Sequence, residues 1–307
     1  MKSLTFVLGL VVAAQSVIIP KEEGILQPRT EPNWSLTFVD NFNGRPGTLP
    51  SSNNWIFDLG TSYLGGAPQW GNNEYETYTS HTSNVQITQR NTLQITPILT
   101  ASGWTSARIE TKCSDFAATP GGRLYVEASL KLGNAPASQQ QGIWPAFWAL
   151  GSDFRGNYTN WPAATEWDFL EVVNGQPTMY STIHCGYAPG GPCNEYNGIG
   201  DGGVSFSMGQ WHTIGFEVDR SGCGSCGGSS WMNESLNWYL DGQLKFKVLG
   251  STVGDEQTWS LLAHQEHFLL LNIAVGGNWP GPPNNQTIDG PGVGMEVDFV
   301  AVWNSNS

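Results

Sequence analysis

The segment EWDFLE, residues 166–171, places three carboxylic acids within six residues, interleaved with one Trp, one Phe and one Leu. Apolar neighbours of this kind predict a strand that enters a hydrophobic core. Alternate residues of a strand share a face, so Glu166 and Asp168 point the same way. A regular strand would send Glu171 to the other face, but one β-bulge after Asp168 returns it to the first. The spacing therefore predicts three carboxylates on one surface.

Glycosidases use two carboxyl groups on one surface as their catalytic groups. A retaining glycosidase uses one as nucleophile and one as acid/base, about 5–5.5 Å apart. Four regular strand steps separate the two glutamates by roughly 13 Å along the backbone. Side chains that lean inward on a concave sheet bring their carboxyl groups closer together than that. A solvated strand face is the alternative, but neighbouring like charges raise one another's pKa and destabilise a fold without a functional reason. Two such groups do not easily both ionise, so one stays protonated, and the spacing leaves open which one.

The composition favours a sugar as the partner. The 307 residues include 14 Trp, only 13% are charged, and the formal net charge is −13. Without a basic patch, nucleic acid and anionic membranes are poor partners for this acidic chain. A neutral polysaccharide is not repelled, and its rings stack on indole while its hydroxyls take hydrogen bonds. Two Trp-dense stretches, GIWPAFWALG and NWPAATEW, lie directly before and at the start of the acidic segment.

Strands joined by turns must position these residues. Alternating patterns occur in SLTFVDNF, NVQITQRNTLQITPI, GRLYVEASLKL and HTIGFEVD. In LNWYLDGQLKFKVL, Asp241-Gly242 between two apolar runs predicts a tight hairpin. HFLLLNIAV and MEVDFVAVW are continuously apolar, as central strands between two layers are, and TWSLLAHQEH is the one segment with a helical pattern. We predict an all-β fold, an antiparallel sandwich that occupies residues 33–307 as one domain.

The start of the chain indicates secretion. Residues 1–16, MKSLTFVLGLVVAAQS, combine a basic Lys2, an apolar run and small residues at Ala14 and Ser16, as a signal peptide does. The run is too short for a membrane anchor, and the C-terminus lacks the tail of a glycolipid anchor. Residues 17–32 lack periodicity and predict a short pro-segment or linker. We expect a secreted, extracellular monomer. Four N-glycosylation sequons fit that route, at Asn33, Asn157, Asn233 and Asn285.

Five cysteines suit an oxidising compartment. Cys185 and Cys193 bracket a Gly- and Pro-rich loop that a disulfide would close. Cys223 and Cys226 read as a redox pair, a zinc half-site or a local disulfide, and the last is favoured because no further zinc ligands lie nearby. Cys113 is left over.

EWDFLE resembles the Glu-x-Asp-x-x-Glu signature of the bulged branch of glycoside hydrolase family 16. Five other stretches are similar, in the same order, to laminarinase-like members of that family: WGNNEYETYT, GWTSARIETK, GIWPAFWALG, STIHCGYAPGGPCNE and LLLNIAVGGNWPG. They cover nearly all of residues 33–303, and the similarity is greatest to secreted fungal endo-β-glucanases. The resemblance implies a concanavalin-like β-jelly roll with a concave substrate groove. Thr165 and Ala107 depart from it, since many relatives have Gly there, and both could reshape the groove.

The resemblance also implies roles for the acids. Glu166 would be the nucleophile and Glu171 the general acid/base, while Asp168 would hydrogen-bond Glu166 and tune its charge. The activity would be endo-hydrolysis of β-1,3- or mixed β-1,3/1,4-glucans. A transglycosylase shares the covalent intermediate and stays possible, whereas a non-catalytic β-glucan-binding lectin would lack the acids.

Further residues are expected to contact the substrate: Arg108, Trp144, Trp148, His184, Asn72 and Trp279. Each has a structural alternative. His184 could be a core histidine, Arg108 could form a salt bridge, for example to Glu110, and the tryptophans could be core residues. The catalysis requires no cofactor. Asp298 could help to hold a structural calcium ion on the convex side, as an equivalent Asp does in some relatives.

Overall fold

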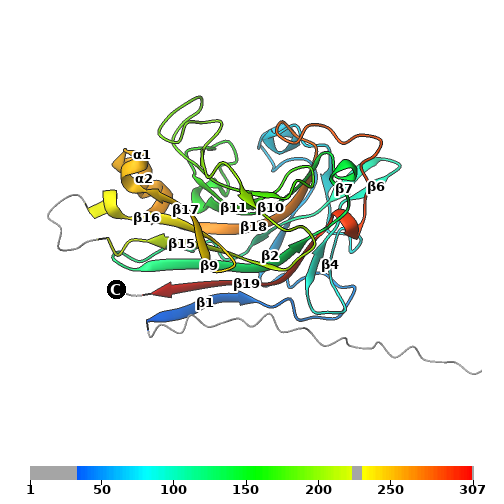
Figure 1. Ribbon diagram of the computed structural model, residues 1–307, viewed down its shortest axis with the longest axis horizontal. Helices are drawn as coiled ribbons and strands as arrows, with labels where there is room; N and C mark the ends of the chain where they lie inside the picture. The colour runs from blue at the N-terminus through cyan, green and yellow to red at the C-terminus, as the bar shows by residue number, and fades with distance from the viewer. Residues whose placement is uncertain (1–32, 223–229, 306–307) are drawn as a thin grey trace, which may run out of the picture.

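Two stacked antiparallel sheets make up most of the protein (Figure 1). The structure, a computed structural model, describes residues 33–222 and 230–305. The predicted signal and linker over residues 1–32, and the cysteines Cys223 and Cys226, lie outside these ranges. Within them, no helix is both long enough and apolar enough to cross a membrane.

The lower layer in Figure 1, here called the outer sheet, has eight strands. Their order is β17 (Gln243–Leu249), β16 (Ser235–Leu240), β15 (His212–Asp219), β9 (Arg123–Leu132), β19 (Met295–Ser305), β5 (Leu93–Ile95) and β4 (Val85–Ile87), and β1 (Trp34–Asp40) pairs with β19. The β16–β17 turn is Asp241-Gly242, whose φ angles of 52° and 73° are those of the predicted two-residue hairpin.

The upper layer, the inner sheet, also has eight strands. Their order is β13 (Ile199–Gly200), β12 (Thr178–His184), β11 (Glu166–Glu171), β10 (Ile143–Gly151), β18 (His267–Val275), β8 (Arg108–Thr111) and β2 (Trp55–Asp58), and β14 (Val204–Ser205) pairs with β12. A small third sheet joins β3 (Thr77–Tyr78), β7 (Gly103–Ser106) and β6 (Ile98–Thr100), and its β3–β7 pair is parallel, unlike the antiparallel pairing predicted.

Helices are short in the described ranges. The segment with the helical pattern, residues 258–267, overlaps α2 (Glu256–His264), which begins two residues earlier, where the Asp255 carboxylate accepts the Thr258 N–H. One turn, α1 (Gly250–Val253), precedes it and was not predicted. Five 3₁₀ turns complete the elements: η1 (Pro68–Gly71), η2 (Ala137–Gln139), η3 (Ser152–Phe154), η4 (Ser230–Asn233) and η5 (Pro291–Val293). The predicted all-β sandwich is confirmed.

The hydrophobic core lies between the two sheets and orients the acidic strand. Trp167 and Phe169 of β11 pack against Phe216 of β15, with ring centroids 4.9 and 4.8 Å apart. Each buried aromatic side chain of this kind contributes roughly 1.5–3 kcal/mol. Since one face of β11 is anchored in this core, its opposite face points away from the outer sheet.

Candidate active site

Strand β11 contains the bulge that the spacing of its acids predicted. In the pairing of β11 with β12, the register shifts between Asp168 and Glu171. The two residues between them, Phe169 and Leu170, are both buried in the core. Because two consecutive side chains enter the core here, Glu171 returns to the face that carries Glu166 and Asp168.

Two tryptophans donate hydrogen bonds to the two glutamates. Trp161 Nε1 lies 3.0 Å from Glu166 Oε2, and Trp144 Nε1 lies 2.9 Å from Glu171 Oε1. Asp168, between them on the strand, is 3% exposed, and its Oδ2 has no hydrogen-bond donor among the described residues. The outer acids are therefore oriented by indole groups, and the central one lies deepest.

The acids raise one another's pKa. Burial, and then the charge of Glu166, raises the pKa of Glu171 to about 7. Burial also raises the pKa of Glu166, against the opposing effects of His184 and the Trp161 indole. Burial and the two glutamate charges raise the pKa of Asp168 well above its ordinary value. The cluster therefore retains at least one proton near neutral pH.

His184 faces the acids from the neighbouring strand β12, where it pairs with Glu166. Its Nδ1 lies 2.7 Å from Glu195 Oε2, and its Nε2 lies 3.6 Å from Asp168 Oδ2. Burial alone would lower the pKa of His184, but the hydrogen bond to Glu195 and the charge of Glu166 outweigh burial and raise it. Glu195 is itself held by the backbone N–H of Cys185, at 2.8 Å.

The predicted disulfide between Cys185 and Cys193 closes the loop that directly precedes Glu195. Neither Glu195 nor Trp161 was predicted to be a site residue. Glu195 ends the segment STIHCGYAPGGPCNE, and Trp161 lies in NWPAATEW, five residues before Glu166, so proximity to the acids and cysteines was the available signal. The remaining cysteine of the described ranges, Cys113, is not in a disulfide.

The salt bridge suggested between Arg108 and Glu110 is wrong. Arg108 Nε lies 3.0 Å from Asp58 Oδ2, and its Nη2 donates to the Tyr63 hydroxyl at 3.1 Å. Glu110 pairs instead with Arg155 at 2.9 Å. The reason is geometric: Asp58 is directly opposite Arg108 on β2, whereas two positions along one strand separate side chains by a larger distance.

Arg108 nevertheless shares the acidic face of the inner sheet. Cross-strand pairing places Arg108, Asn272 and, beyond β10, Glu171 in one row. The guanidinium carbon lies 4.7 Å from the ring centroids of both Trp70 and Trp148. Cation–π contacts and the ion pair thus hold this buried cation.

The predicted aromatic residues lie on the same side. Trp144 and Trp148 share one face of β10 and are both partly exposed, and Trp148 Nε1 donates to Asn272 Oδ1 at 2.7 Å. Trp279 is 46% exposed and meets Trp144 edge-on at 5.7 Å. The backbone carbonyl of Asn72 accepts the N–H of the residue before Trp279, at 2.8 Å. The two predicted rim loops therefore meet beside Trp144.

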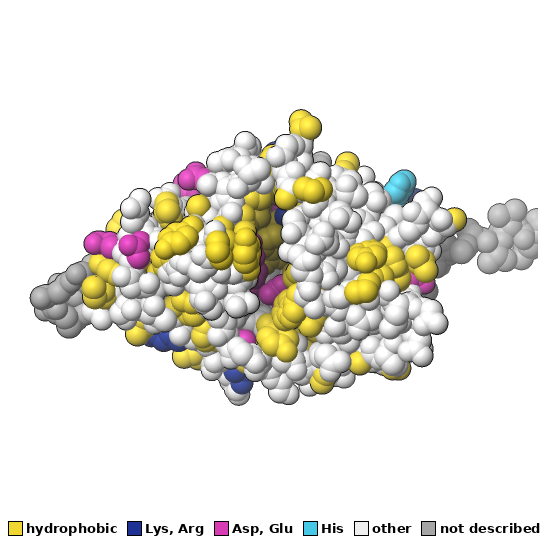
Figure 2. All heavy atoms as spheres, turned by 90° about the horizontal axis from the view of Figure 1, so that it is seen from above, with side chains coloured by type: hydrophobic (Ala, Val, Ile, Leu, Met, Phe, Trp, Pro, Cys, Tyr) yellow, Lys and Arg dark blue, Asp and Glu magenta, His cyan; other side chains and the backbone are white. Residues whose placement is uncertain are grey.

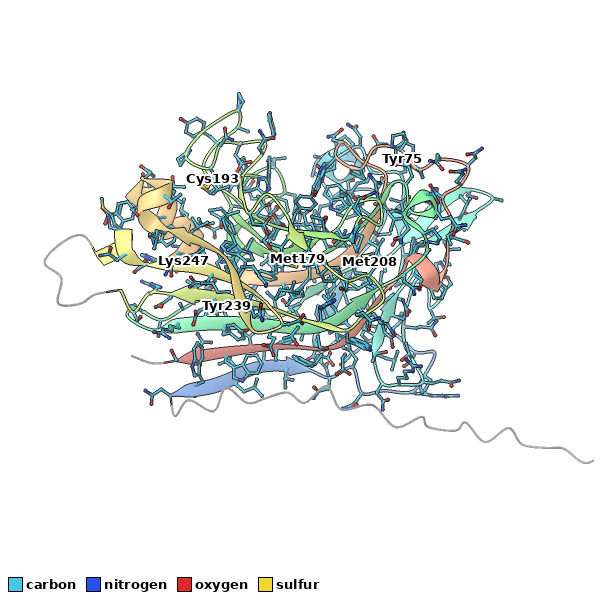
Figure 3. The ribbon with its side chains drawn as sticks, viewed as in Figure 1. Tyr75, Met179, Cys193, Met208, Tyr239 and Lys247 are labelled. Carbon is cyan, nitrogen blue, oxygen red and sulfur yellow. A yellow bond between two sulfur atoms is a disulfide. The ribbon has the colours of Figure 1, made fainter. Side chains whose placement is uncertain are left out.

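A hollow crosses this face of the molecule. Figure 2 shows it from above, with acidic side chains at its base and apolar side chains along its walls. Figure 3 shows Cys193 and Tyr75 in the two groups of loops that rise on either side. The hollow is open at the surface, so a polymer chain can lie across the acids.

The departure from the family pattern at Thr165 has a structural compensation. Thr165 has φ of 67°, a left-handed conformation that favours Gly and is costly for a β-branched residue. Its Oγ1 lies 3.0 Å from His267 Nε2, and His267 Nδ1 lies 3.0 Å from the Gln265 carbonyl. Burial lowers the pKa of His267 to about 3, so the ring is neutral, Nδ1 donates to the carbonyl, and Nε2 accepts the Thr165 hydroxyl. Ala107, the other departure, is fully buried in the core and does not line the groove.

Asp298 lies in the other layer, buried on β19 of the outer sheet. Among the described residues, one group of three His, Cys, Asp or Glu side chains is close enough to hold a metal ion, and it consists of Glu166, Asp168 and His184. Asp298 is not part of such a group, and a calcium ion there stays a prediction.

Several known proteins with similar sequences and folds are named as endo-1,3-β-glucanases or endo-1,3-β-glucosidases, although no protein-family model matches the chain. A glucan endo-1,3-β-glucosidase A1 from Niallia circulans is 29% identical over 88% of this chain, which spans 38% of that relative's length. A glucan endo-1,3-β-glucosidase from Cryptopygus antarcticus is 28% identical over 89% of this chain and 93% of its own. The relatives are mostly bacterial and do not support a particular similarity to fungal enzymes.

The solved structure of an endo-1,3-β-glucanase from Streptomyces sioyaensis has a TM-score of 0.84 and 41% identity, covering 91% of this chain and 99% of that one. Identity at this level, over nearly the whole of both chains and on the same fold, goes beyond a shared architecture. The chain belongs to the endo-1,3-β-glucanase family, the laminarinase type of glycoside hydrolase family 16.

Proposed function

We propose that the protein is a retaining endo-β-glucanase that cleaves β-1,3-glucans, and mixed β-1,3/1,4-glucans with them. The observation that carries this proposal is the convergence of Glu166, Asp168 and Glu171 on one face of a bulged strand, at the base of an open hollow. The relatives' names supply the linkage, since they are called endo-1,3-β-glucosidases and an endo-1,3-β-glucanase.

In the first step, a Glu166 oxygen attacks the anomeric carbon while the bond to the bridging oxygen breaks, and that oxygen takes the proton of Glu171. In the second, Glu171 accepts a proton from a water molecule whose oxygen displaces Glu166. Two inversions at one carbon give retention. The pKa of about 7 lets Glu171 carry its proton at neutral pH, and the Trp161 indole and His184 favour the charged form of Glu166.

Asp168 and His184 would tune the nucleophile. Burial and the charges of the two glutamates raise the pKa of Asp168 well above its ordinary value and so favour its protonated form. A protonated Asp168 donates a hydrogen bond to Glu166 and leaves the negative charge on the attacking group. His184 is held by Glu195, and its raised pKa favours a positive charge beside the acids.

The sugar units would lie against the aromatic walls. Trp144 and Trp279 form a corner beside Glu171, and Trp148 is held by Asn272 on the floor. Such rings offer apolar faces to the pyranose units. Arg108 and Asn72 are placed to supply hydrogen bonds, although the Arg108 donors already serve Asp58 and Tyr63, which makes its role in part the fixing of the floor.

Secretion belongs to the same proposal. The four sequon asparagines are all exposed, so the fold leaves each accessible to glycosylation: Asn33, Asn157, Asn233 and Asn285. A monomeric state and catalysis without a cofactor stay predictions from the sequence alone.

A digest of laminarin, lichenan and xyloglucan with purified protein tests the proposal. We expect oligosaccharides from laminarin early in the reaction, and an NMR spectrum in which the new reducing end first has the β configuration. Cleavage of xyloglucan alone would contradict the substrate, and an initial α product would contradict the double displacement. Longer products from an added acceptor would indicate a transglycosylase, and glucan binding without any cleavage would indicate a lectin.

A further inference from the structure

The group formed by Glu166, Asp168 and His184 has the donor set of a transition-metal site. One ligand atom from each of the three lies within 4.8 Å of the others. Two carboxylate oxygens and one imidazole nitrogen are ligands that zinc accepts. Like-charged acids this close repel one another, and a divalent cation would relieve that repulsion.

The spacing of two of these atoms already suits a common metal ion. Zinc binds His nitrogen and carboxylate oxygen at about 2.1 Å, so two such ligands at a tetrahedral angle lie about 3.4 Å apart. His184 Nε2 and Asp168 Oδ2 are 3.6 Å apart. Asp168 Oδ2 is buried, and no hydrogen-bond donor satisfies it among the described residues. A buried carboxylate oxygen that accepts no hydrogen bond from the described residues thus lies at a suitable distance from the imidazole nitrogen.

The surroundings of His184 are those of a metal-binding histidine. Glu195 Oε2 lies 2.7 Å from His184 Nδ1, so this carboxylate can accept a hydrogen bond from a proton on Nδ1. In the neutral ring that a metal ion would bind, the lone pair is then on Nε2, the atom that faces Asp168. A ligating His usually donates its other N–H to a carboxylate in this way, which fixes the ring and strengthens the ligand. Glu195 is fixed in turn by the backbone N–H of Cys185.

We propose that Glu166, Asp168 and His184 bind a divalent transition-metal ion of the zinc type, and that the bound ion blocks glucan cleavage. The hollow gives the ion a path to the site (Figure 2). A rotation of the Glu166 side chain would bring in the third ligand of the group. The nitrogen ligand selects zinc-like ions over calcium and magnesium, which prefer oxygen alone. The predicted inhibition rests on the proposed function, because the bound ion would occupy Glu166, the proposed nucleophile. The predicted metal binding does not depend on that function.

Isothermal titration of the tag-free, EDTA-treated protein with zinc chloride measures the binding directly. We expect one zinc site in the wild type. The zinc affinity of that site should fall by at least about 100-fold in His184→Ala. Glu195→Gln should weaken binding about 10–100-fold, since it removes the carboxylate that orients the ring. Co²⁺ should give visible d–d absorption bands in the wild type that vanish in His184→Ala, and Ca²⁺ should not bind there.

His212→Ala is the matched control. His212 also pairs through Nδ1 with a carboxylate, that of Asp241, but its Nε2 faces a backbone carbonyl instead of acids. Zinc affinity should be unchanged in this variant. If His184→Ala fails to fold, as judged by its thermal transition in EDTA, Asp168→Asn replaces it. No zinc binding by the wild type, or equal binding by the wild type and the His184 variant, would overturn the proposal. Zinc binding by a protein that cleaves no glucan would leave the site standing and remove the proposed activity.

Discussion

The indole Nε1 of Trp144 lies 2.9 Å from Oε1 of Glu171, so a tryptophan of the groove wall is also a hydrogen-bond donor to the acid at the groove base. An N–H aimed at a carboxylate stabilises its charged form. This contact opposes the rise in the pKa of Glu171 that burial and the charge of Glu166 produce. In the proposed mechanism, Trp144 would therefore couple substrate binding to proton transfer.

Trp144→Phe should move the basic limb of the pH profile. Without the indole N–H, the pKa of Glu171 rises further above 7, and the acid stays protonated to higher pH. A hydrogen bond to a charged group is worth about 1.5–3 kcal/mol, so the basic limb of kcat/KM on laminarin oligosaccharides should shift upward by about one pH unit or more. Trp148→Phe is the control. Its indole serves Asn272, so KM should rise while the limb stays in place, and an equal shift in both variants would refute the coupling.

Azide should distinguish the two glutamates. With an activated aryl β-glucoside, Glu171→Ala keeps the nucleophile, forms the glycosyl-enzyme and gives a β-glycosyl azide, because azide needs no general base. Glu166→Ala lacks the nucleophile, so azide attacks directly and gives the α product. On substrates with poor leaving groups, the rate of cleavage by both variants should fall about 10²–10⁴-fold or more. NMR of the products reads the configuration, and exchanged configurations would reverse the assigned roles.

Glu171→Gln should stabilise the protein at high pH. The folded-state pKa of about 7 lies above the ordinary value of 4.5, so the folded state binds more protons between these values and stability falls as pH rises through them. Gln removes that penalty, which is at most about 3 kcal/mol, and still accepts the Trp144 N–H. In EDTA buffer, Tm of the variant should exceed that of the wild type at pH 8, and the difference should vanish near pH 4. A lower Tm at pH 8 would contradict the proposed burial of this charge.

Thr165→Val should be more destabilising than Thr165→Gly. Val keeps the branched side chain in the left-handed conformation and removes the hydroxyl that satisfies His267 Nε2, at a cost of about 1–3 kcal/mol. Gly removes the same hydrogen bond but relieves a backbone strain of about 1–2 kcal/mol. Urea unfolding of both variants measures the order, and a Val variant as stable as the wild type would show that the hydrogen bond contributes nothing.

The sequence by itself determined the elements and the faces of the site. The period of two and the extra residue before Leu170 predicted the bulge, because the alternation of side chains follows from strand geometry within one segment. The Asp241-Gly242 hairpin was predictable for the same reason, since two adjacent positive φ angles demand particular residues. These constraints are local, because residues that are close in the sequence specify them.

Only the tertiary structure decided which side chains meet. Asp58, not Glu110, is the partner of Arg108, because β2 lies beside β8 in the inner sheet. Glu195 follows the disulfide-closed loop and contacts His184, which lies before that loop, at the end of β12. Trp161 contacts Glu166 from the segment between β10 and β11. No local pattern specifies contacts of this kind. Their distances depend on strand order, register and loop path, and those are set by the packing of the whole chain against a common core.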